Sequence, residues 1–223
     1  FQKINFLKII HILIFVSPLT LVVMGITNTF NVLKMDEYVS GTYTGTGTVR
    51  GEAKELSLTA DTRTFLYEET ISSAIKNNYV LFGRTPARGY DSEHFGDYQK
   101  FELKTGKSER FSSEVSILNI FTWMGLVGAF MYMLVFYKAS KLAILKSNNI
   151  YIKIMGLYVG FRFLYAFIED FTRFDLSNIF LWIIIGMCFS KKFRKMNNQE
   201  IRIWVWSIFY TPQLLSFNKS KYI

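Results

Sequence analysis

The side chains with the most obvious chemical potential lie in one polar stretch, residues 28–112. Apolar residues recur there at four-residue spacing, at Tyr67, Ile71 and Ile75. With Asp61 as its N-cap, this spacing predicts a helix over residues 62–77. Arg63 then falls in the first turn, where a cation opposes the helix dipole at a cost of up to about 1 kcal/mol. Arg63 is therefore either a solvated side chain or, with the free amides of that turn, part of a site for an anion such as phosphate.

Three more arginines follow in the same stretch. Arg84 and Arg88 lie in a turn-rich piece, residues 81–89, and Arg110 comes near the end of the stretch. A guanidinium suits bidentate recognition of phosphate better than an ammonium does. These side chains are therefore further candidates for binding a phosphate.

Two other polar patterns are weaker. Residues 45–51 have one residue too many for the glycine fingerprint of dinucleotide-binding proteins and lack a preceding apolar strand, so we predict an ordinary Gly/Thr loop. Asp91, Glu93 and His94 could ligate a divalent cation, but no second cluster of carboxylates or histidines supports them. The sequence therefore predicts no metal site and no cofactor.

The remaining candidates border the apolar blocks. Glu114 stands where the second block begins, and a carboxylate at that depth either reaches back to water or serves a site. Arg162 lies inside the third block, where a cation is costly in lipid. Glu169 falls seven residues later, on the same face of a continuous helix, with Asp170 beside it. These side chains form either a structural ion pair at the outer end of the bundle or part of a polar cavity.

The elements that must position these side chains are apolar blocks close to the length of about 20 residues that crosses a bilayer. Hydrophobic residues make up 50% of the 223-residue chain, and they gather in blocks instead of recurring at helix or strand period. The blocks are residues 9–27, 113–137, 150–168 and 174–190. We predict an all-α membrane protein, a multi-pass helical bundle of about four spans with one large, partly helical extracytoplasmic loop.

Basic residues set the orientation of this bundle. A formal charge of +9 could indicate nucleic acid, but the lysines and arginines outside the loop cluster just beyond the apolar blocks. Short cytoplasmic loops carry such an excess, which places both ends of the chain in the cytoplasm and the large loop outside. The chain then divides into a first span with its flank (1–27), the outer loop (28–112), three spans (113–190) and a cytoplasmic or interfacial tail (191–223).

The combined pattern resembles the O-antigen polymerase and O-antigen ligase family of bacterial envelope glycosyltransferases. Three features carry the resemblance: an arginine at the head of a loop helix, the Phe-Gly-Arg turn at residues 82–84, and re-entry into the membrane through a segment ending in Gly125-x-x-Gly128. The likeness covers about residues 9–195. We expect the chain to be the C-terminal part of such an enzyme.

The resemblance implies an enzyme of the bacterial inner membrane, with the large loop in the periplasm. It would polymerise or ligate polyprenyl-pyrophosphate-linked oligosaccharide repeat units in O-antigen or capsule synthesis, alongside other polysaccharide-assembly proteins and without a metal. Arg63 would bind the pyrophosphate, and Glu114 would act as base toward the acceptor hydroxyl. Secondary contacts to the pyrophosphate or glycan would come from Arg84, Arg88 and Arg110. Glu114 and Val115 stand where the ligase branch has a histidine and a polar residue, which favours the polymerase branch.

A transporter or flippase component for lipid-linked glycans is the alternative. Transporters tend to place ionisable residues at mid-membrane in broken helices. In this sequence the ionisable residues gather in the outer loop, and the spans are almost uncharged apart from Arg162. This distribution favours an enzyme that acts at the membrane surface.

Overall fold

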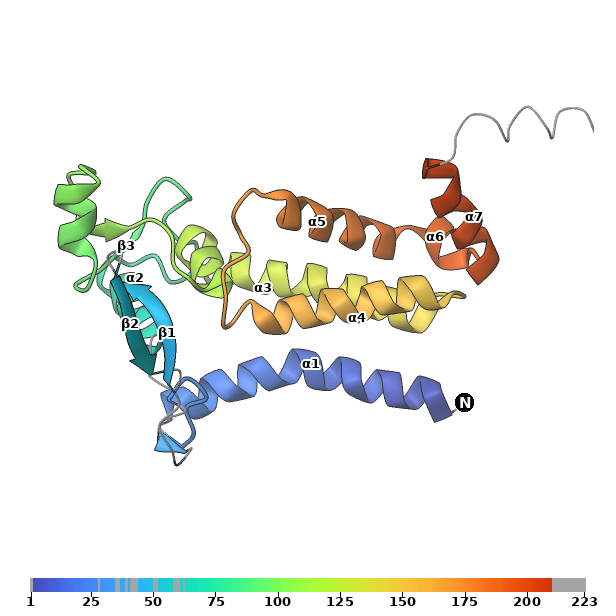
Figure 1. The fold of residues 1–223 in the computed structure, drawn as a ribbon, viewed down its shortest axis with the longest axis horizontal. Helices are drawn as coiled ribbons and strands as arrows, with labels where there is room; N and C mark the ends of the chain where they lie inside the picture. Colours follow the sequence, from blue (N-terminus) through green and yellow to red (C-terminus); the bar gives the residue numbers. More distant parts are fainter. Residues whose placement is uncertain are drawn as a thin grey trace, which may run out of the picture. The chain divides into compact units, whose positions relative to one another are not determined.

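A computed structural model of the chain describes residues 2–27, 29–34, 37–38, 40, 44–49, 52–57, 61 and 63–209, with side chains from residue 6 onward outside 45–57. The described part is mostly helical (Figure 1), which confirms the helical class. The chain forms two compact units. One comprises Phe1–Ile14, Met133–Phe163 and Arg173–Ile223, and the other Phe15–Tyr132 and Leu164–Thr172.

The four apolar blocks form helices. They are α1 (Gln2–Ile26), α3 (Ser116–Lys146), α4 (Ile150–Tyr165) and α5 (Leu176–Phe189). Phe6–Ile26 within α1 and the whole of α3 are long and apolar enough to cross a membrane, and α5 is a shorter apolar helix. The number of spans stays a prediction.

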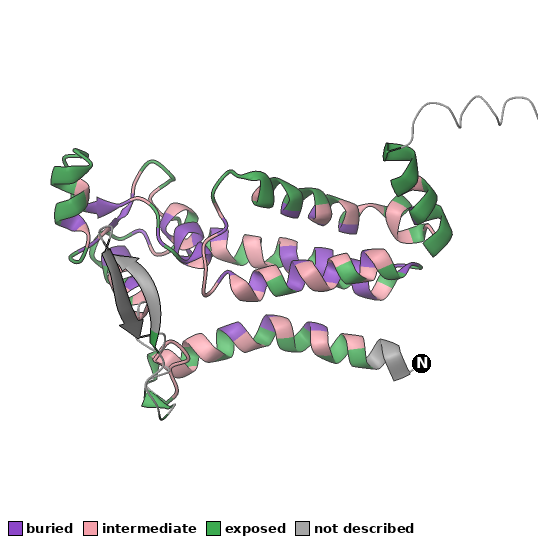
Figure 2. Cartoon of the chain, viewed as in Figure 1, coloured by how far each residue is buried: buried purple, intermediate pink, exposed green. Residues whose placement is uncertain are grey.

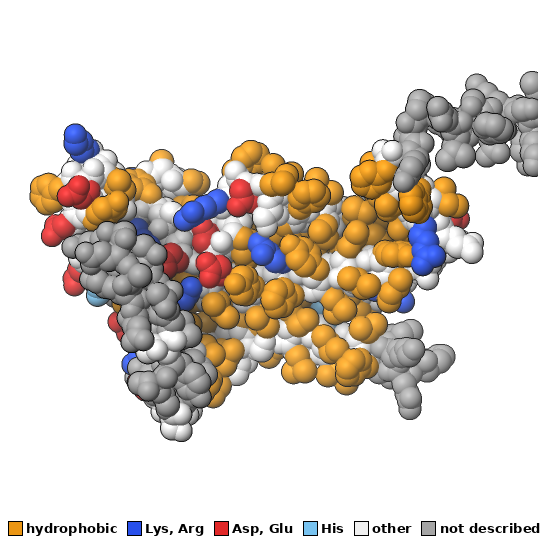
Figure 3. All heavy atoms as spheres, viewed as in Figure 1, with side chains coloured by type: hydrophobic (Ala, Val, Ile, Leu, Met, Phe, Trp, Pro, Cys, Tyr) orange, Lys and Arg blue, Asp and Glu red, His pale blue; other side chains and the backbone are white. Residues whose placement is uncertain are grey.

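Much of the apolar surface of these helices is exposed. On α1 the side chains of Ile9, Leu13, Val16 and Val23 are all about half exposed or more (Figure 2). Hydrophobic side chains cover long stretches of the helices in the space-filling view (Figure 3). Covering such surface gains about 25 cal/mol per Å², so the helices present faces suited to lipid or to another apolar surface.

The polar stretch contains more strand than predicted. Strands β1 (Thr44–Val49) and β2 (Glu52–Ser57) form an antiparallel hairpin whose register runs from Thr44↔Ser57 to Val49↔Glu52. The predicted Gly/Thr loop is therefore wrong. Threonine recurs at every second position of β1, which is the period of a strand and suits a β-branched residue.

The rest of the stretch contains a helix, a short π-helix and a second small sheet. The helix is α2 (Thr64–Lys76), the π-helix is η2 (Tyr98–Glu102), and β3 (Tyr90–Asp91) pairs with β4 (Glu109–Arg110). The predicted helix over residues 62–77 is thus confirmed to within two residues. Its buried face carries Leu66, Thr70, Ser73 and Ala74. Leu66 packs with Val115 and Leu118 in a small core.

In the other unit, close packing and side-chain caps hold the helices together. A Cβ at Gly156 would meet the Cβ of Ala143 at 2.5 Å, so α3 and α4 approach through small residues. Asn149 donates to the carbonyls of Phe193 and Met196 and so ties α6 (Lys191–Lys195) to the start of α4. The predicted tail contains α6 and α7 (Asn198–Phe209), and residues 210–223 lie outside the described residues.

Candidate functional site

A break in α3 anchors the polar stretch. Gly125 has φ 66° and ψ −165°, so the helix is interrupted there. This backbone conformation is accessible almost only to glycine. The break leaves carbonyls before Gly125 and amides after it without partners in the helix.

The Phe-Gly turn supplies those partners. The amides of Arg84 and Thr85 donate to the carbonyls of Thr122 and Trp123, at 2.7 and 2.9 Å. In the opposite direction, the amides of Leu126 and Val127 donate to the carbonyls of residues 80 and 81, at 2.9 and 3.2 Å. The turn therefore completes the hydrogen bonding of the broken helix.

Two glycines allow this close approach. Gly83 has φ 72°, and a Cβ there would clash with the backbone of Trp123 and Met124. A Cβ on Gly125 would likewise clash with the backbone of Leu81. The Phe-Gly-Arg turn and the Gly125-x-x-Gly128 segment, two of the three sequence features behind the family resemblance, are thus in contact. About 40 residues separate them in the chain.

The first group of charged residues, which we call the Glu109 cluster, contains Arg84, Arg88, Asp91 and Glu109. Arg88 donates to both oxygens of Glu109, at 2.6 and 2.9 Å. Arg84 Nη1 lies 3.1 Å from Asp91 Oδ1 and 3.9 Å from Glu109 Oε1. The hydrogen bond from Arg88 lowers the pKa of the Glu109 carboxyl, although burial opposes this shift. The cluster therefore neutralises its own charges.

The Arg84 side chain makes further contacts outside the carboxylates. Its guanidinium lies 4.8 Å from the centre of the Tyr79 ring and donates to the Gly89 carbonyl at 2.8 Å. Only 12% of its side chain is exposed. Phosphate binding by Arg84 or Arg88 remains a prediction, and it would require breaking pairs that hold the loop together.

The second group, the Glu169 cluster, contains Arg63, Ser116 and Glu169. Arg63 Nη2 contacts Glu169 Oε2 at 3.2 Å through a single pair of atoms. The Glu169 carbonyl accepts hydrogen bonds from the amide and hydroxyl of Ser116 at the start of α3. The side chains of Arg63 and Glu169 are 27% and 46% exposed. An anion can therefore approach this ion pair from solvent.

The start of α2 differs in detail from the prediction. The helix begins at Thr64, so Arg63 occupies the N-cap position instead of the first turn. Asp61 Oδ1 accepts from the amides of Arg63 and Thr64, at 3.0 and 2.9 Å. Because a carboxylate already occupies these two amides, an anion at this end of α2 would depend mainly on the Arg63 side chain.

Glu114 lies just before α3, in a segment without regular structure. Its Oε1 accepts from Arg110 Nη2 at 3.0 Å, and 51% of its side chain is exposed. Arg110 is itself buried, with its guanidinium 4.0 Å from the centre of the Phe95 ring. Arg110 thus holds the predicted base in place.

The predicted helix face shared by Arg162 and Glu169 is wrong. Helix α4 ends at Tyr165, so Glu169 lies beyond it and its carboxylate pairs with Arg63. Asp170 orders the following turn, because its Oδ1 accepts from the amide and hydroxyl of Thr172, at 2.9 and 2.6 Å. An ion pair or polar cavity at Arg162 stays a prediction.

Sequence analysis missed the role of Glu69. Its carboxylate accepts from the amides of Glu93 and His94, from the Ser92 hydroxyl and from the His94 ring, all within 3.0 Å. Burial of Glu69 opposes ionisation, yet these hydrogen bonds lower its pKa overall. No local pattern indicates this, because donor and acceptor lie 23–25 residues apart. The described residues contain no group of His, Cys, Asp and Glu that could hold a metal ion.

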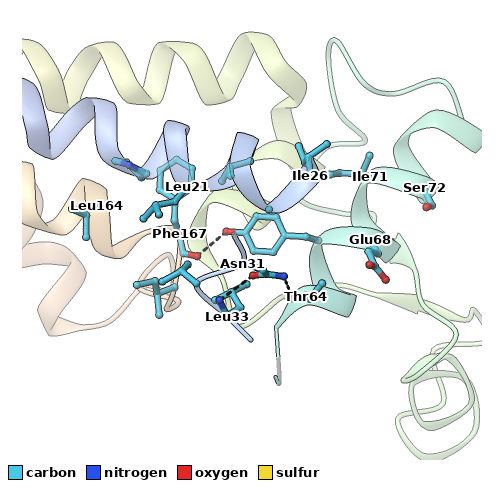
Figure 4. Close-up of a pocket in the computed structure, with 16 residues that line it drawn as sticks. Leu21, Ile26, Asn31, Leu33, Thr64, Glu68, Ile71, Ser72, Leu164 and Phe167 are labelled. Carbon is cyan, nitrogen blue, oxygen red and sulfur yellow. Dashed lines mark hydrogen bonds between the residues drawn. The ribbon is translucent and has the colours of Figure 1, made fainter. Parts of the chain in front are cut away.

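Two cavities lie on α2. The first, of about 420 Å³, is lined by the last turns of α1, by the segment after α1, by α2 and by residues 164–168 (Figure 4). The second, of about 660 Å³, is lined by α2 and by residues 91–94 and 107–109. Both have the size of ligand pockets, which is about 300–1,000 Å³.

Comparison of the chain with protein-family models, with curated proteins and with solved structures finds no match. The resemblance to envelope glycosyltransferases therefore rests on the residues named above.

Proposed function

We propose that this chain is the C-terminal part of an integral-membrane glycosyltransferase of the bacterial inner membrane. It polymerises polyprenyl-pyrophosphate-linked oligosaccharide repeat units for a surface polysaccharide. Ligation of such oligosaccharides is the second candidate activity. The observation that carries the proposal is the Phe-Gly turn seated in the Gly125 break. This contact joins the arginine-bearing loop to an apolar helix, as an enzyme working at a membrane surface requires.

The membrane placement is supported by the helices and by charge. Two helices have the length and composition of spans, and α1 exposes a large apolar surface. Lys138, Lys141 and Lys146 lie in the last turns of α3, and four basic residues at 191–195 come just after α5, as expected on the cytoplasmic side. We propose about four spans with the loop outside.

The free-energy cost of breaking an existing ion pair differs between the two clusters, and this difference indicates which arginine binds the pyrophosphate. A partly exposed ion pair such as Arg63–Glu169 contributes about 0–1 kcal/mol, so exchanging Glu169 for a pyrophosphate oxygen costs little. Removing a partner from the buried Glu109 carboxylate would cost about 3 kcal/mol. Arg63 is therefore the better ligand for a substrate anion, and Arg84 and Arg88 are structural.

The proposed reaction needs no redox partner. The acceptor hydroxyl oxygen attacks the anomeric carbon of the donor sugar and forms the new glycosidic bond. The bond from that carbon to the pyrophosphate oxygen breaks, and the lipid pyrophosphate leaves with the electron pair. Arg63 stabilises the charge that develops on the leaving group. The hydroxyl proton passes to Glu114, whose position Arg110 fixes.

The transporter alternative has one observation in its favour, the broken helix. In transporters the unwound backbone of such a helix coordinates the substrate or ion. Here the carbonyls of Thr122 and Trp123 and the amides of Leu126 and Val127 are already bonded to the loop. The break therefore offers no open backbone groups at these positions, which favours the enzyme.

The test uses the full-length protein in the cell that makes the polysaccharide. Arg63→Ala and Glu114→Gln are compared with two variants of exposed residues in the same loop, Lys100→Ala and Glu102→Gln. Surface glycan is separated on a gel, and membrane levels of each protein are measured.

We expect both site variants to lose the polysaccharide ladder at normal protein levels, while the controls keep it. Single repeat units on the acceptor would identify a polymerase, and polymer stranded on the lipid carrier would identify a ligase. A normal ladder from both site variants would refute the proposal.

A further inference from the structure

The two cavities on α2 differ in chemistry but adjoin. Glu68 and Ser72 line both of them. The apolar cavity faces one side of the helix, where Tyr67 and Ile71 lie, and the polar cavity faces the other, where Phe65 and Glu69 lie. Helix α2 thus separates an apolar cavity on one of its sides from a polar cavity on the other.

The first cavity suits a hydrocarbon chain. One wall is the end of α1, an apolar helix long enough to span a membrane, so the cavity can receive a chain from the bilayer. Two polar groups inside it are already bonded: the Tyr67 hydroxyl donates to the Phe167 carbonyl at 2.7 Å, and the Asn31 amide donates to Thr64 at 3.0 Å (Figure 4). An apolar ligand therefore leaves none of these groups unsatisfied.

The second cavity suits a glycan. Hydroxyls, carboxylates and ammonium groups line it, with the aromatic ring of Phe65. Sugar hydroxyls both donate and accept hydrogen bonds and so can pair with each of these groups. Part of this lining is held in place by the Glu69 carboxylate, because Ser92, Glu93 and His94 all bond to it.

The junction joins the two ligand chemistries. In the close-up of the first cavity, Leu164 lies at one end and Glu68 and Ser72 lie at the other (Figure 4). Arg63, to which the proposed function assigns the pyrophosphate, directly precedes Thr64, which lines the first cavity. The pyrophosphate therefore lies at the start of α2, beside the first cavity.

We infer that one amphiphilic substrate lies across α2, with its hydrocarbon chain in the first cavity and its oligosaccharide in the second. The inference rests on the proposed function and assigns the substrate's two halves to named surfaces. A cavity of about 420 Å³ holds only the part of a long polyprenyl chain nearest the pyrophosphate, so the rest of the chain remains in the bilayer.

The experiment uses the full-length protein in nanodiscs and two probes. One is a polyprenyl pyrophosphate with a diazirine in its first isoprene units, and the other carries an oligosaccharide on the same lipid. After illumination, labelled peptides are mapped by mass spectrometry. We expect label on residues 18–26 and 164–168, which line the first cavity.

Two variants on α2 test the chain site. Ile71→Trp fills the first cavity, whereas Ile75→Trp adds the same bulk one turn later, at a position that is 64% exposed and lines neither cavity. We expect Ile71→Trp to reduce labelling by both probes at least tenfold and Ile75→Trp to leave it within about twofold.

A third variant tests the glycan site. Ser108→Trp narrows the second cavity from an exposed position. We expect it to lower labelling by the glycosylated probe about fivefold and to leave the bare lipid probe unchanged.

The outcomes separate this inference from the proposed function. Label outside the first cavity in the unmodified protein, equal effects of the two tryptophan variants on α2, or displacement by excess phosphatidylglycerol would each overturn the inference, even if sugar transfer occurs. Label in the first cavity that Ile71→Trp abolishes would uphold it, even if the gel assay finds no transfer.

Discussion

The two arginine clusters, around Glu109 and around Glu169, use the same side-chain chemistry for opposite purposes. In the Glu109 cluster a buried carboxylate accepts hydrogen bonds from Arg88 Nε and Nη2 and so links two distant parts of the loop. In the Glu169 cluster Arg63 contacts its carboxylate through a single pair of atoms, and both side chains are partly exposed. Burial and bonding geometry, more than residue type, decide how much stability is lost when an arginine exchanges its carboxylate for a substrate.

The largest effect is expected where the loop meets α3. Gly125→Ala would force alanine into a left-handed conformation and press its Cβ against the Leu81 backbone. The strain alone costs about 1–3 kcal/mol, and the hydrogen bonds to the Phe-Gly turn would be lost as well. We expect the loop to undock and the Glu109 cluster to become accessible to protease.

Gly186→Ala is the matched control, because a Cβ there meets nothing within 4 Å. It should leave the unfolding temperature unchanged or raise it slightly. If both substitutions have the same effect, the break at Gly125 does not anchor the loop.

The next largest effect should come from Glu109→Gln. The amide keeps the shape of the side chain but leaves Arg88 and the buried Arg84 without their shared carboxylate. We expect a loss of about 3 kcal/mol in the free energy of unfolding, measured by thermal or denaturant unfolding. Glu102→Gln, at an exposed position on η2, should change it by less than about 0.5 kcal/mol.

Acid should loosen the buried cluster. The pKa values of Glu69, Asp91 and Glu109 are lower in the folded chain than their ordinary values. Such carboxylates stabilise the fold above their unfolded pKa of about 4, and this contribution is lost as pH falls through the folded pKa. The protection of amides in residues 84–110 against hydrogen exchange, relative to the unfolded chain at the same pH, should therefore fall below about pH 4. Protection factors that stay constant or rise on acidification would contradict this.

A smaller effect is expected from Tyr67→Phe. The Tyr67 hydroxyl donates to the Phe167 carbonyl and links α2 to the segment that carries Glu169. Its removal should cost about 1 kcal/mol and widen the distance distribution between spin labels on the two segments. An unchanged distribution would show that the Glu169 cluster does not depend on this bond.

Sequence analysis predicted the elements whose signals are local. Apolar blocks became helices, and the four-residue spacing with Asp61 located α2. The hairpin was missed because its alternating threonines were taken for a loop. The charge pairing was missed for a different reason: Arg63 and its partner Glu169 lie 106 residues apart. No spacing rule connects such residues, and the assumed helix from Arg162 to Glu169 ended early at Tyr165.

The most direct test of the division between the clusters compares Arg63→Gln with Arg84→Gln in the full-length protein. For each variant, transfer of the lipid-linked oligosaccharide and the unfolding temperature are measured on the same preparation. We predict that Arg63→Gln reduces transfer at least a hundredfold, equivalent to about 2.7 kcal/mol, and barely shifts the unfolding temperature. Arg84→Gln should lower the unfolding temperature markedly. The opposite pattern, with transfer intact in Arg63→Gln and the fold unaffected in Arg84→Gln, would contradict the account.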